Sequence, residues 1–320
     1  MSYIQWGGKR WYQPKPQPRK PDINELMKPL SEKVGTGNIW GSVIMNVQKD
    51  GGVTLPPAFD ADAAAYLSAV ISAGGSLDAT ISGATDTLFT SLKSAGIYSK
   101  LLAFYPMIGA TQYSTALNGK RTNSQFDIDW VDGSDLTYDY SGVTGGRSNS
   151  ITTRGGNTHI IPNNDLTIGS RHMALYVNNT ITNVGGYEMG GGDGNDNATI
   201  VNFYTNGMYF SYGAHNNIAS SDVNGFYYSQ VSGSSSPYNI QGFRNGVQKV
   251  NSTTIDSGGN RYLSLLCDNR QNPPAFDAGS EASARRMAWA SYGDDLTASQ
   301  ITSFETIIND FQTTLGRNIY

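Results

Sequence analysis

The sequence has little of what stabilises small exported proteins or membrane proteins. Its 320 residues include one cysteine, Cys267, so no intramolecular disulfide framework can form. Charged residues make up only 15% of the chain, and no apolar run approaches the roughly 18 residues that a membrane helix needs. We therefore expect a soluble chain that is stabilised by burial or oligomerisation, with Cys267 as a buried, unreactive thiol.

Residues that carry metals or catalysis are also scarce. The three histidines, His159, His172 and His215, lie far apart and none stands at zinc spacing from Cys267. No Gly-x-Ser-x-Gly elbow with a downstream acid and histidine is present. We expect the histidines to be ordinary strand or loop residues and expect no cofactor.

One glycine-rich run resembles the start of a calcium loop, because Asp193, Asn195 and Asn197 alternate as its first oxygen ligands do. The sixth position is Ala198 instead of glycine, and the twelfth is Tyr204 instead of a bidentate glutamate. A polar surface loop is therefore the favoured interpretation, with a metal site as the weak alternative.

Glycine (37) and tyrosine (19) are abundant, a composition that favours turns and aromatic strands over helical bundles. Short apolar runs separated by Gly, Asn, Asp and Ser clusters predict the strands of a sandwich or jelly roll. In one run Met173, Leu175 and Val177 alternate with His172, Ala174 and Tyr176, so one face should be core. The runs cover residues 126–131, 136–140, 159–161, 171–177, 200–212 and 225–231.

The C-terminal third has the clearest local signals. Asn245-Gly246 separates two apolar strands and predicts a tight hairpin. Further on, Met287 and Trp289 should share one face of a strand. Residues 262–267 are apolar on both faces, which suits an inner strand covered by a sheet on one side and a helix on the other.

A closing helix is predicted after Thr297, which stands at capping-box spacing from Gln300. Gly316 supplies the C-terminal stop. Its apolar stripe, expected to pack on the preceding sheet, consists of Ile301, Phe304, Ile307, Ile308, Phe311 and Leu315.

Residues 59–105 are predicted to be helical. A first helix covers residues 59–73, starting at Asp60 or Asp62 and ending at Gly74-Gly75. A second covers about 83–95, and a short third covers 97–105 until Pro106 stops it.

Residues 1–58 read as an extended arm and a hairpin. Prolines 14, 16, 18 and 21 favour polyproline-like segments up to residue 37, although residues 22–33 could form a short helix. A hairpin is predicted over residues 39–55 around Asp50-Gly51-Gly52, and oligomerisation is its favoured use. The first twenty residues are basic, whereas the whole chain has a net charge of −4.

The arm should dock onto a partner protein, since exposed aromatic residues without a core of their own need a surface to lie on. Contact with nucleic-acid phosphates or plain solvated disorder are the alternatives, the first disfavoured by the prolines. The proposed docking residues are Trp6, Lys9, Arg10, Trp11 and Tyr12.

Two patches carry a family resemblance. Arg286-Met-Ala-Trp-Ala-Ser-Tyr-Gly-Asp-Asp-Leu-Thr, with the Asn-Gly-Val turn before it and Phe311-Gln-Thr-Thr-Leu-Gly-Arg after it, forms the first. The second comprises the Ala-rich run from Phe59 and residues 92–109. From Phe59 onward the chain resembles the concanavalin A-like (laminin-G-like) jelly-roll domains of tailed-bacteriophage virion proteins.

The resemblance implies an antiparallel jelly-roll sandwich over residues 106–320, a helical lead-in over 59–105, and an N-terminal segment, 1–58, for virion attachment or oligomerisation. It further implies a non-enzymatic fibre, spike or decoration protein, assembled in the host cytoplasm and located in the virion. The expected partners are capsid, portal or tail proteins, further copies of the chain in a homo-oligomer such as a trimer, and host surface polysaccharide.

A glycoside hydrolase on the same fold and a free bacterial lectin remain alternatives. The hydrolase is disfavoured because the five glutamates, at 25, 32, 188, 281 and 305, do not form the Glu-x-Asp-x-x-Glu pattern of such enzymes. The free lectin is disfavoured because we find no secretion signal in the sequence. The aspartate pairs Asp127/Asp129 and Asp294/Asp295 suit a solvated strand face and a helix start better than catalysis. We expect no catalytic residues.

Glycan binding needs aromatic platforms beside amide and hydroxyl groups, and residues 204–228 are rich in both. Core filling or a subunit contact is the alternative use of these aromatics. The glycan-binding candidates are Tyr204, Tyr209, Tyr212, His215, Asn216 and Asn217.

Overall fold

The computed structural model divides the chain into two compact units, Met1–Ala58 and Phe59–Tyr320. Before residue 59, and between 198 and 219, it describes only the backbone of strands. The described residues are 3–6, 9–12, 46–47, 53–54, 59–131, 136–145, 155–179, 187–191, 198–204, 207–212, 216–219, 224–254, 259–267, 269 and 283–319.

The first unit contains two antiparallel hairpins. β3 (Asn46–Val47) pairs with β4 (Val53–Thr54), as predicted for this region. β1 (Tyr3–Trp6) pairs with β2 (Lys9–Tyr12), where an extended segment was expected. In the sequence, the Gly7-Gly8 pair between these strands is a hairpin turn signal. The prediction of an extended arm, which was based on the prolines, did not take it into account. The short helix considered for residues 22–33 lies outside the described residues.

Two helices open the second unit. α2 (Ala61–Ser72) starts at Asp60, whose side chain accepts the backbone N–H groups of Asp62 and Ala63, as predicted. α3 (Ala79–Ser94) begins four residues before the predicted start, because Asp78 caps it by accepting the N–H of Ile81 at 2.7 Å. Lys93 bridges Asp60 (2.7 Å) and Asp62 (2.5 Å) and so ties the end of α3 to the start of α2.

The third predicted helix, over residues 97–105, is wrong. Only the 3-10 turn η1 (Tyr98–Lys100) is helical, and it leads into strand β5 (Leu101–Tyr105). β5 pairs antiparallel with β19 (Arg286–Gly293). The run Leu-Leu-Ala-Phe-Tyr is apolar throughout, so its periodicity cannot separate a buried strand from a helix, and the pairing with β19 decides.

The larger sheet has eight antiparallel strands in the order β17-β16-β15-β10-β19-β8-β7, with β5 beside β19. The Asn245-Gly246 hairpin between β16 and β17 is confirmed, with φ angles of 47° and 70°. Its other strands are β7 (Thr137–Asp139), β8 (Gly142–Thr144), β10 (Ser170–Val177), β15 (Gly225–Ser232), β16 (Tyr238–Arg244) and β17 (Val247–Thr254).

The smaller sheet has seven antiparallel strands in the order β14-β13-β12-β11-β18-β9-β6. The predicted run 200–212 forms two of them, β12 and β13, and the predicted strand 159–161 is wrong because β9 ends at Asn157. Its strands are β6 (Asp129–Val131), β9 (Gly155–Asn157), β11 (Tyr187–Gly191), β12 (Ala198–Tyr204), β13 (Gly207–Tyr212), β14 (Asn216–Ala219) and β18 (Ser264–Leu265).

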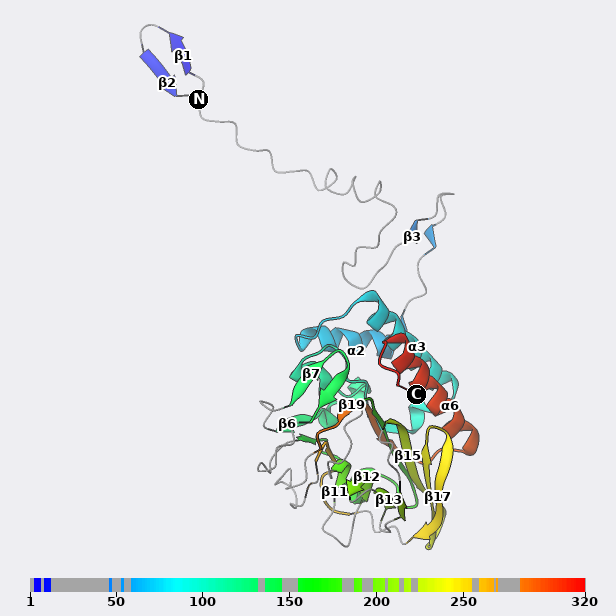
Figure 1. Cartoon of the computed structure of the whole chain (residues 1–320). Coiled ribbons are helices and arrows are strands. Elements are labelled where there is room, and N and C mark those ends of the chain that lie inside the picture. The colour runs from blue at the N-terminus through cyan, green and yellow to red at the C-terminus, as the bar shows by residue number, and fades with distance from the viewer. Residues whose placement is uncertain are drawn as a thin grey trace. The chain divides into compact units, whose positions relative to one another are not determined.

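Two hydrophobic cores lie on the two faces of the larger sheet. One joins the sheets, with Met173, Leu175 and Val177 from β10 facing Met189 and Leu265. The other lies between the sheet and the helices, and in Figure 1 α2, α3 and α6 gather on one side of the strands. The alternation predicted for β10 is confirmed, but its second face, with Ala174 and Tyr176, is core as well.

The closing helix α6 (Ala298–Thr314) is confirmed, including the capping box of Thr297 and Gln300. Ile301, Phe304, Ile308 and Phe311 are buried, and Ile307 and Leu315 pack against the same core. Phe304 meets the rings of Phe226 and Trp289 edge-on. The short helices α4 (Gln112–Thr115) and α5 (Pro162–Asp165) and the 3-10 turn η2 (Arg121–Phe126) complete the described elements.

Met287 and Trp289 do not share a face, contrary to the prediction. Trp289 pairs with Tyr176 and belongs to the helix-side core, whereas Met287 pairs with Val177 and belongs to the core between the sheets. The register shift between these pairs is a β-bulge at Ala288, and one extra residue reverses the alternation. Trp289 is 0% exposed.

The prediction for residues 262–267 is wrong in one respect. β18 lies in the smaller sheet, with Leu263 and Leu265 in the core between the sheets, so it is not the strand beneath the helix. Cys267 is buried and free, as expected. In the described part of the chain, no helix has the length and hydrophobicity to cross a membrane.

The burial of His172 predicts that the folded protein loses stability as the pH falls. Its ring is fully buried on β10, stacks on Tyr228, and donates from Nδ1 to the carbonyl of Asp294 at 2.5 Å. Burial lowers the pKa of His172 to about 4 from an unfolded value near 6.5, despite the opposing effects of that bond and of Asp295. As pH falls from about 6.5 to 4 the unfolded chain takes up the proton first, so stability declines by roughly 3 kcal/mol.

The measurement is urea unfolding at a series of pH values from 7.5 to 4. His172→Gln, which keeps a neutral polar side chain, should show a shallower decline over this window. An identical decline in both proteins would contradict the assignment.

Candidate functional site

A buried arginine near the C-terminus joins the segments that shape a surface hollow. Arg317 follows α6 and is 4% exposed. Its Nε donates to Gln312 Oε1 at 2.9 Å, and its other nitrogens donate to the carbonyls of Met107 (3.0 Å), Pro106 (3.2 Å), Ala288 (3.4 Å) and Tyr140 (3.5 Å). Burial lowers the pKa of Arg317 to about 10. Carbonyl dipoles thus take the place of a paired carboxylate around this cation.

The bulge in β19 provides one of these acceptors. The carbonyl of Ala288 accepts both Gln312 Nε2 (3.3 Å) and Arg317. A bulge interrupts the ladder and leaves backbone groups unpaired, so these two side chains satisfy a carbonyl that the sheet does not. The last turn of α6 is therefore fixed to β19 at one defined position.

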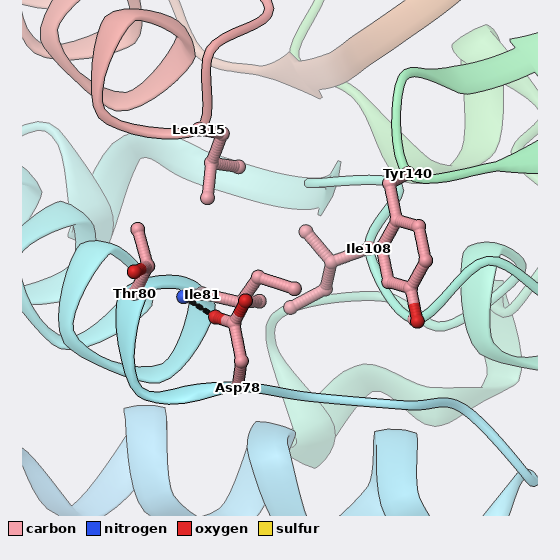
Figure 2. A pocket seen from close by; sticks show the side chains of 7 residues that line it. Asp78, Thr80, Ile81, Ile108, Tyr140 and Leu315 are labelled. Carbon is pink, nitrogen blue, oxygen red and sulfur yellow. Dashed lines mark hydrogen bonds between the residues drawn. The ribbon is translucent and has the colours of Figure 1, made fainter.

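The hollow lies where these segments meet and has a volume of about 180 Å³. Its walls come from the start of α3, the loop after β5, the β7–β8 turn and the end of α6 (Figure 2). The lining residues are Asp78, Thr80, Ile81, Ile108, Gly109, Tyr140 and Leu315. It is smaller than the 300 Å³ or more typical of sites for drug-sized ligands, so it suits a single ring.

Asp78 supplies the charge of the hollow. One carboxylate oxygen accepts the N–H of Ile81, the bond drawn in Figure 2, which fixes the side chain at the N-terminus of α3. Among the described residues the other oxygen has no hydrogen-bond partner. The carboxylate therefore keeps acceptor capacity for a ligand at a position set by the helix cap.

Tyr140 supplies the aromatic surface and is 56% exposed. Its turn is fixed on three sides: Asp139 accepts the N–H of Ser141 at 2.7 Å, Arg317 holds the carbonyl of Tyr140, and Gly142 lies against β19. A Cβ on Gly142 would stand 2.2 Å from the carbonyl oxygen of Met287, and its φ is 128°, so only glycine fits. The backbone that carries the ring is therefore fixed.

A second polar cluster lies on the smaller sheet. His159 Nε2 lies 2.9 Å from Asp129 Oδ2, and the edge of the imidazole meets the ring of Tyr262. His159 has a φ of 60°, held by the side chain of Asn157, which accepts its N–H at 2.9 Å. These bonds account for the local backbone conformation of His159.

Glu188 lies on β11 of the smaller sheet and is completely buried. It pairs with Arg285 and accepts the hydroxyl of Ser283 at 2.8 Å. Burial raises the pKa of Glu188, opposed by Arg285 and Ser283. Because Glu188 is buried and paired with Arg285, we interpret the pair as structural. It joins β11 to the segment before β19.

The aspartates considered as pairs have separate contacts. Asp127 binds Arg121 at 2.7 Å and accepts the N–H of Asn118, whereas Asp129 faces His159. The carbonyl of Asp294 accepts from His172, and Asp295 accepts the hydroxyl of Ser170 at 2.5 Å. Within the described residues no three of His, Cys, Asp and Glu gather as metal ligands.

The predicted glycan and arm residues are described only in part. Tyr204, Tyr209, Tyr212, Asn216 and Asn217 lie on β12, β13 and β14, which the ladder places side by side, with Tyr209 opposite Asn217. The arm residues lie on β1 and β2. Their side chains, together with His215 and the calcium-loop residues Asp193, Asn195 and Asn197, lie outside the described residues, so these assignments stay predictions.

The hollow itself was missed by sequence reasoning. Asp78 carried a usable signal, since an aspartate three residues before Ile81 is a helix N-cap, but the helix was started at residue 83. Nothing local connects Tyr140 with Leu315 or Ile108, because the segments that carry them meet only in the fold, through the bonds of Arg317 and the helix-side core.

No protein-family model matches the chain, and no curated protein matches it. Solved structures give distant likenesses. Trypanosoma rangeli sialidase in complex with sialic acid has a TM-score of 0.46 and 9% identity, over 71% of this chain and 39% of the sialidase. The chain thus spans about two fifths of that protein.

Two other likenesses are weaker. The binding domain of botulinum neurotoxin DC in complex with rat synaptotagmin II has a TM-score of 0.40 and 9% identity, over 68% of this chain and 52% of that one. Domain 4 of the Geobacillus stearothermophilus arabinanase AbnA in complex with arabinotriose has a TM-score of 0.35 and 14% identity, over 64% and 98%. Scores this low transfer neither a family nor a ligand to this chain.

Replacing Arg317 should strongly destabilise the folded protein. Arg317→Met should lower the free energy of unfolding by more than about 3 kcal/mol, since several buried carbonyls each lose a partner worth about 1–3 kcal/mol. Arg317→Lys keeps a positive charge but has a single ammonium donor group. Its free energy of unfolding should therefore lie between those of the unchanged protein and Arg317→Met. Urea unfolding measures both.

The matched control is Arg121→Met, which removes a partly exposed arginine (22%) from its pair with Asp127 and should cost about 1 kcal/mol. Equal losses in Arg317→Met and Arg121→Met would show that the carbonyl cluster does not hold the C-terminal segment.

Proposed function

We propose that the chain is a non-enzymatic structural protein of a tailed-bacteriophage virion, a fibre, spike or decoration module that displays a carbohydrate-binding jelly roll. Residues 1–58 attach it to capsid, portal or tail proteins, and copies of the chain associate as a homo-oligomer such as a trimer. The bound carbohydrate is host surface polysaccharide.

The hollow beside Tyr140 is the observation that carries carbohydrate binding. A sugar ring offers an apolar C–H face and a rim of hydroxyl donors. The hollow offers an exposed aromatic ring, the apolar side chains of Ile81, Ile108 and Leu315, and the oxygens of Asp78 and Thr80. Apolar walls with a few placed polar groups are the usual composition of a small-molecule site.

The contacts of the carboxylates favour binding over hydrolysis. Glycoside hydrolysis needs two carboxyl groups on either side of the scissile bond. Of the residues that the structure describes, Asp78 is the only carboxylate that lines the hollow. Elsewhere in the described chain, Asp60 is committed to Lys93, Asp127 to Arg121 and Glu188 to Arg285.

The virion context is supported by the sequence. The motifs from Phe59 onward resemble virion jelly rolls, and the basic, aromatic N-terminal residues belong to a separate compact unit. A basic segment joined to an acidic body suits attachment to an acidic protein surface.

Tyr140→Ala tests the carbohydrate site. On an array of host surface glycans the full chain should bind, and Tyr140→Ala should bind at least tenfold more weakly, because aromatic stacking on the ring is lost. Tyr113→Ala is the control, since Tyr113 is 71% exposed but does not line the hollow. Equal weakening by both variants would place the site elsewhere, and release of reducing ends from host capsule would contradict a non-enzymatic role.

A second prediction concerns attachment. Particles assembled with a chain that lacks residues 1–37 should lose the protein, whereas the truncated chain should keep the thermal unfolding of the second unit. Immunoblots of purified particles measure incorporation against the full chain. Undiminished incorporation would show that the N-terminal residues are not the attachment site.

A further inference from the structure

The charges around the hollow restrict what it can hold. Among the described residues that line it, Asp78 is the only charged side chain, and the other polar side chains are the hydroxyls of Thr80 and Tyr140. Asp78 accepts hydrogen bonds and donates none when ionised. A ligand must therefore bring donors to this wall.

Arg317, which bonds the carbonyl of Tyr140 beside the hollow, is not available to pair with a ligand's negative charge. Arg317 lies behind the wall that carries Tyr140, is 4% exposed, and donates to Gln312 and four backbone carbonyls. Turning it toward a ligand would leave those buried acceptors without partners. A carboxylate placed in the hollow would face Asp78, and no cation lines the hollow within the described part of the chain.

The N-terminus of α3 does not change this balance. Its first turn carries the partial positive charge of a helix end, but Asp78 already accepts the N–H of Ile81 there. A second anion at this helix end would lie beside the Asp78 carboxylate, and the two negative charges would repel each other. The helix end therefore stabilises Asp78 rather than an acidic ligand.

Size and shape narrow the ligand further. About 180 Å³ bounded by Ile81, Ile108, Leu315 and Tyr140 suits the apolar face of one ring, with its hydroxyl edge toward Asp78 and Thr80 (Figure 2). We infer that the hollow takes a single uncharged sugar ring, which donates hydroxyl groups to Asp78, and excludes sugars that carry a carboxylate. This inference rests on the proposed carbohydrate-binding function.

The test uses the full chain and matched pairs of glycans that end either in a neutral hexose or in the same hexose capped with sialic or glucuronic acid. Neutral ends should bind at least about tenfold more tightly than acidic ends. Asp78→Asn should weaken binding of neutral ends about tenfold, since a hydrogen bond to a charged acceptor becomes one to a neutral acceptor. In Asp78→Asn the difference in affinity between glycans with neutral ends and glycans with acidic ends should also become smaller.

Asn is a good N-cap, so Asp78→Asn keeps the start of α3. Asp310→Asn is the control, because it makes the same change in net charge on an exposed residue of α6 outside the hollow, and binding should be unchanged. Thr80→Ala, which leaves the cap intact, should also weaken binding of neutral ends.

The outcomes separate the two proposals. Acidic ends that bind as tightly as neutral ends, or Asp78→Asn binding like Asp310→Asn, would overturn the inference and leave carbohydrate binding in place. Failure of every neutral and acidic glycan to bind the full chain would overturn the proposed function, and the inference with it.

Discussion

The burial of Arg317 is the constraint on which the arrangement of the second unit depends. A guanidinium removed from water is stable only where enough acceptors surround it, and here these are the Gln312 side chain and four backbone carbonyls. The carbonyls come from the loop after β5, the β7–β8 turn and the bulge in β19. One side chain therefore requires three segments distant in sequence to meet at the end of α6, and it defines the position of Tyr140.

The helices bury the face of the larger sheet that does not pack against the smaller sheet. Trp289, Tyr176 and Phe304 fill the core between β10, β19 and α6, while Met173 and Leu175 fill the core on the opposite face. The central strands of this sheet are consequently buried on both sides and present no face to a ligand. Surfaces for recognition are left to its turns, to the smaller sheet and to the junction of helices and turns where the hollow lies.

Much of the local structure could be predicted, and the failures have physical causes. The alternation of β10 was readable because polar and apolar residues differ, whereas residues 101–105 are apolar throughout and only their pairing with β19 makes them a strand. The bulge at Ala288 leaves no mark in the sequence, and it places Met287 and Trp289 in different cores. The candidate site was predicted on residues 204–217, while the hollow depends on Asp78 and Tyr140, which are 62 positions apart and adjoin only in the fold.

The sequence by itself determined the features that depend on neighbouring residues: the Asn245-Gly246 turn, the capping box of Thr297 and Gln300, the starts and stops of α2 and α6, and a mainly antiparallel β architecture. The turn, the capping box and the helix ends follow from backbone conformations and hydrogen bonds within a few residues, and the architecture follows from composition and the spacing of short apolar runs. The tertiary structure alone decided the strand identity of β5, the faces of β19 and the hollow beside Tyr140. These depend on satisfying buried groups, above all Arg317 and the carbonyl of Ala288, with partners far away in the chain, which local patterns do not encode.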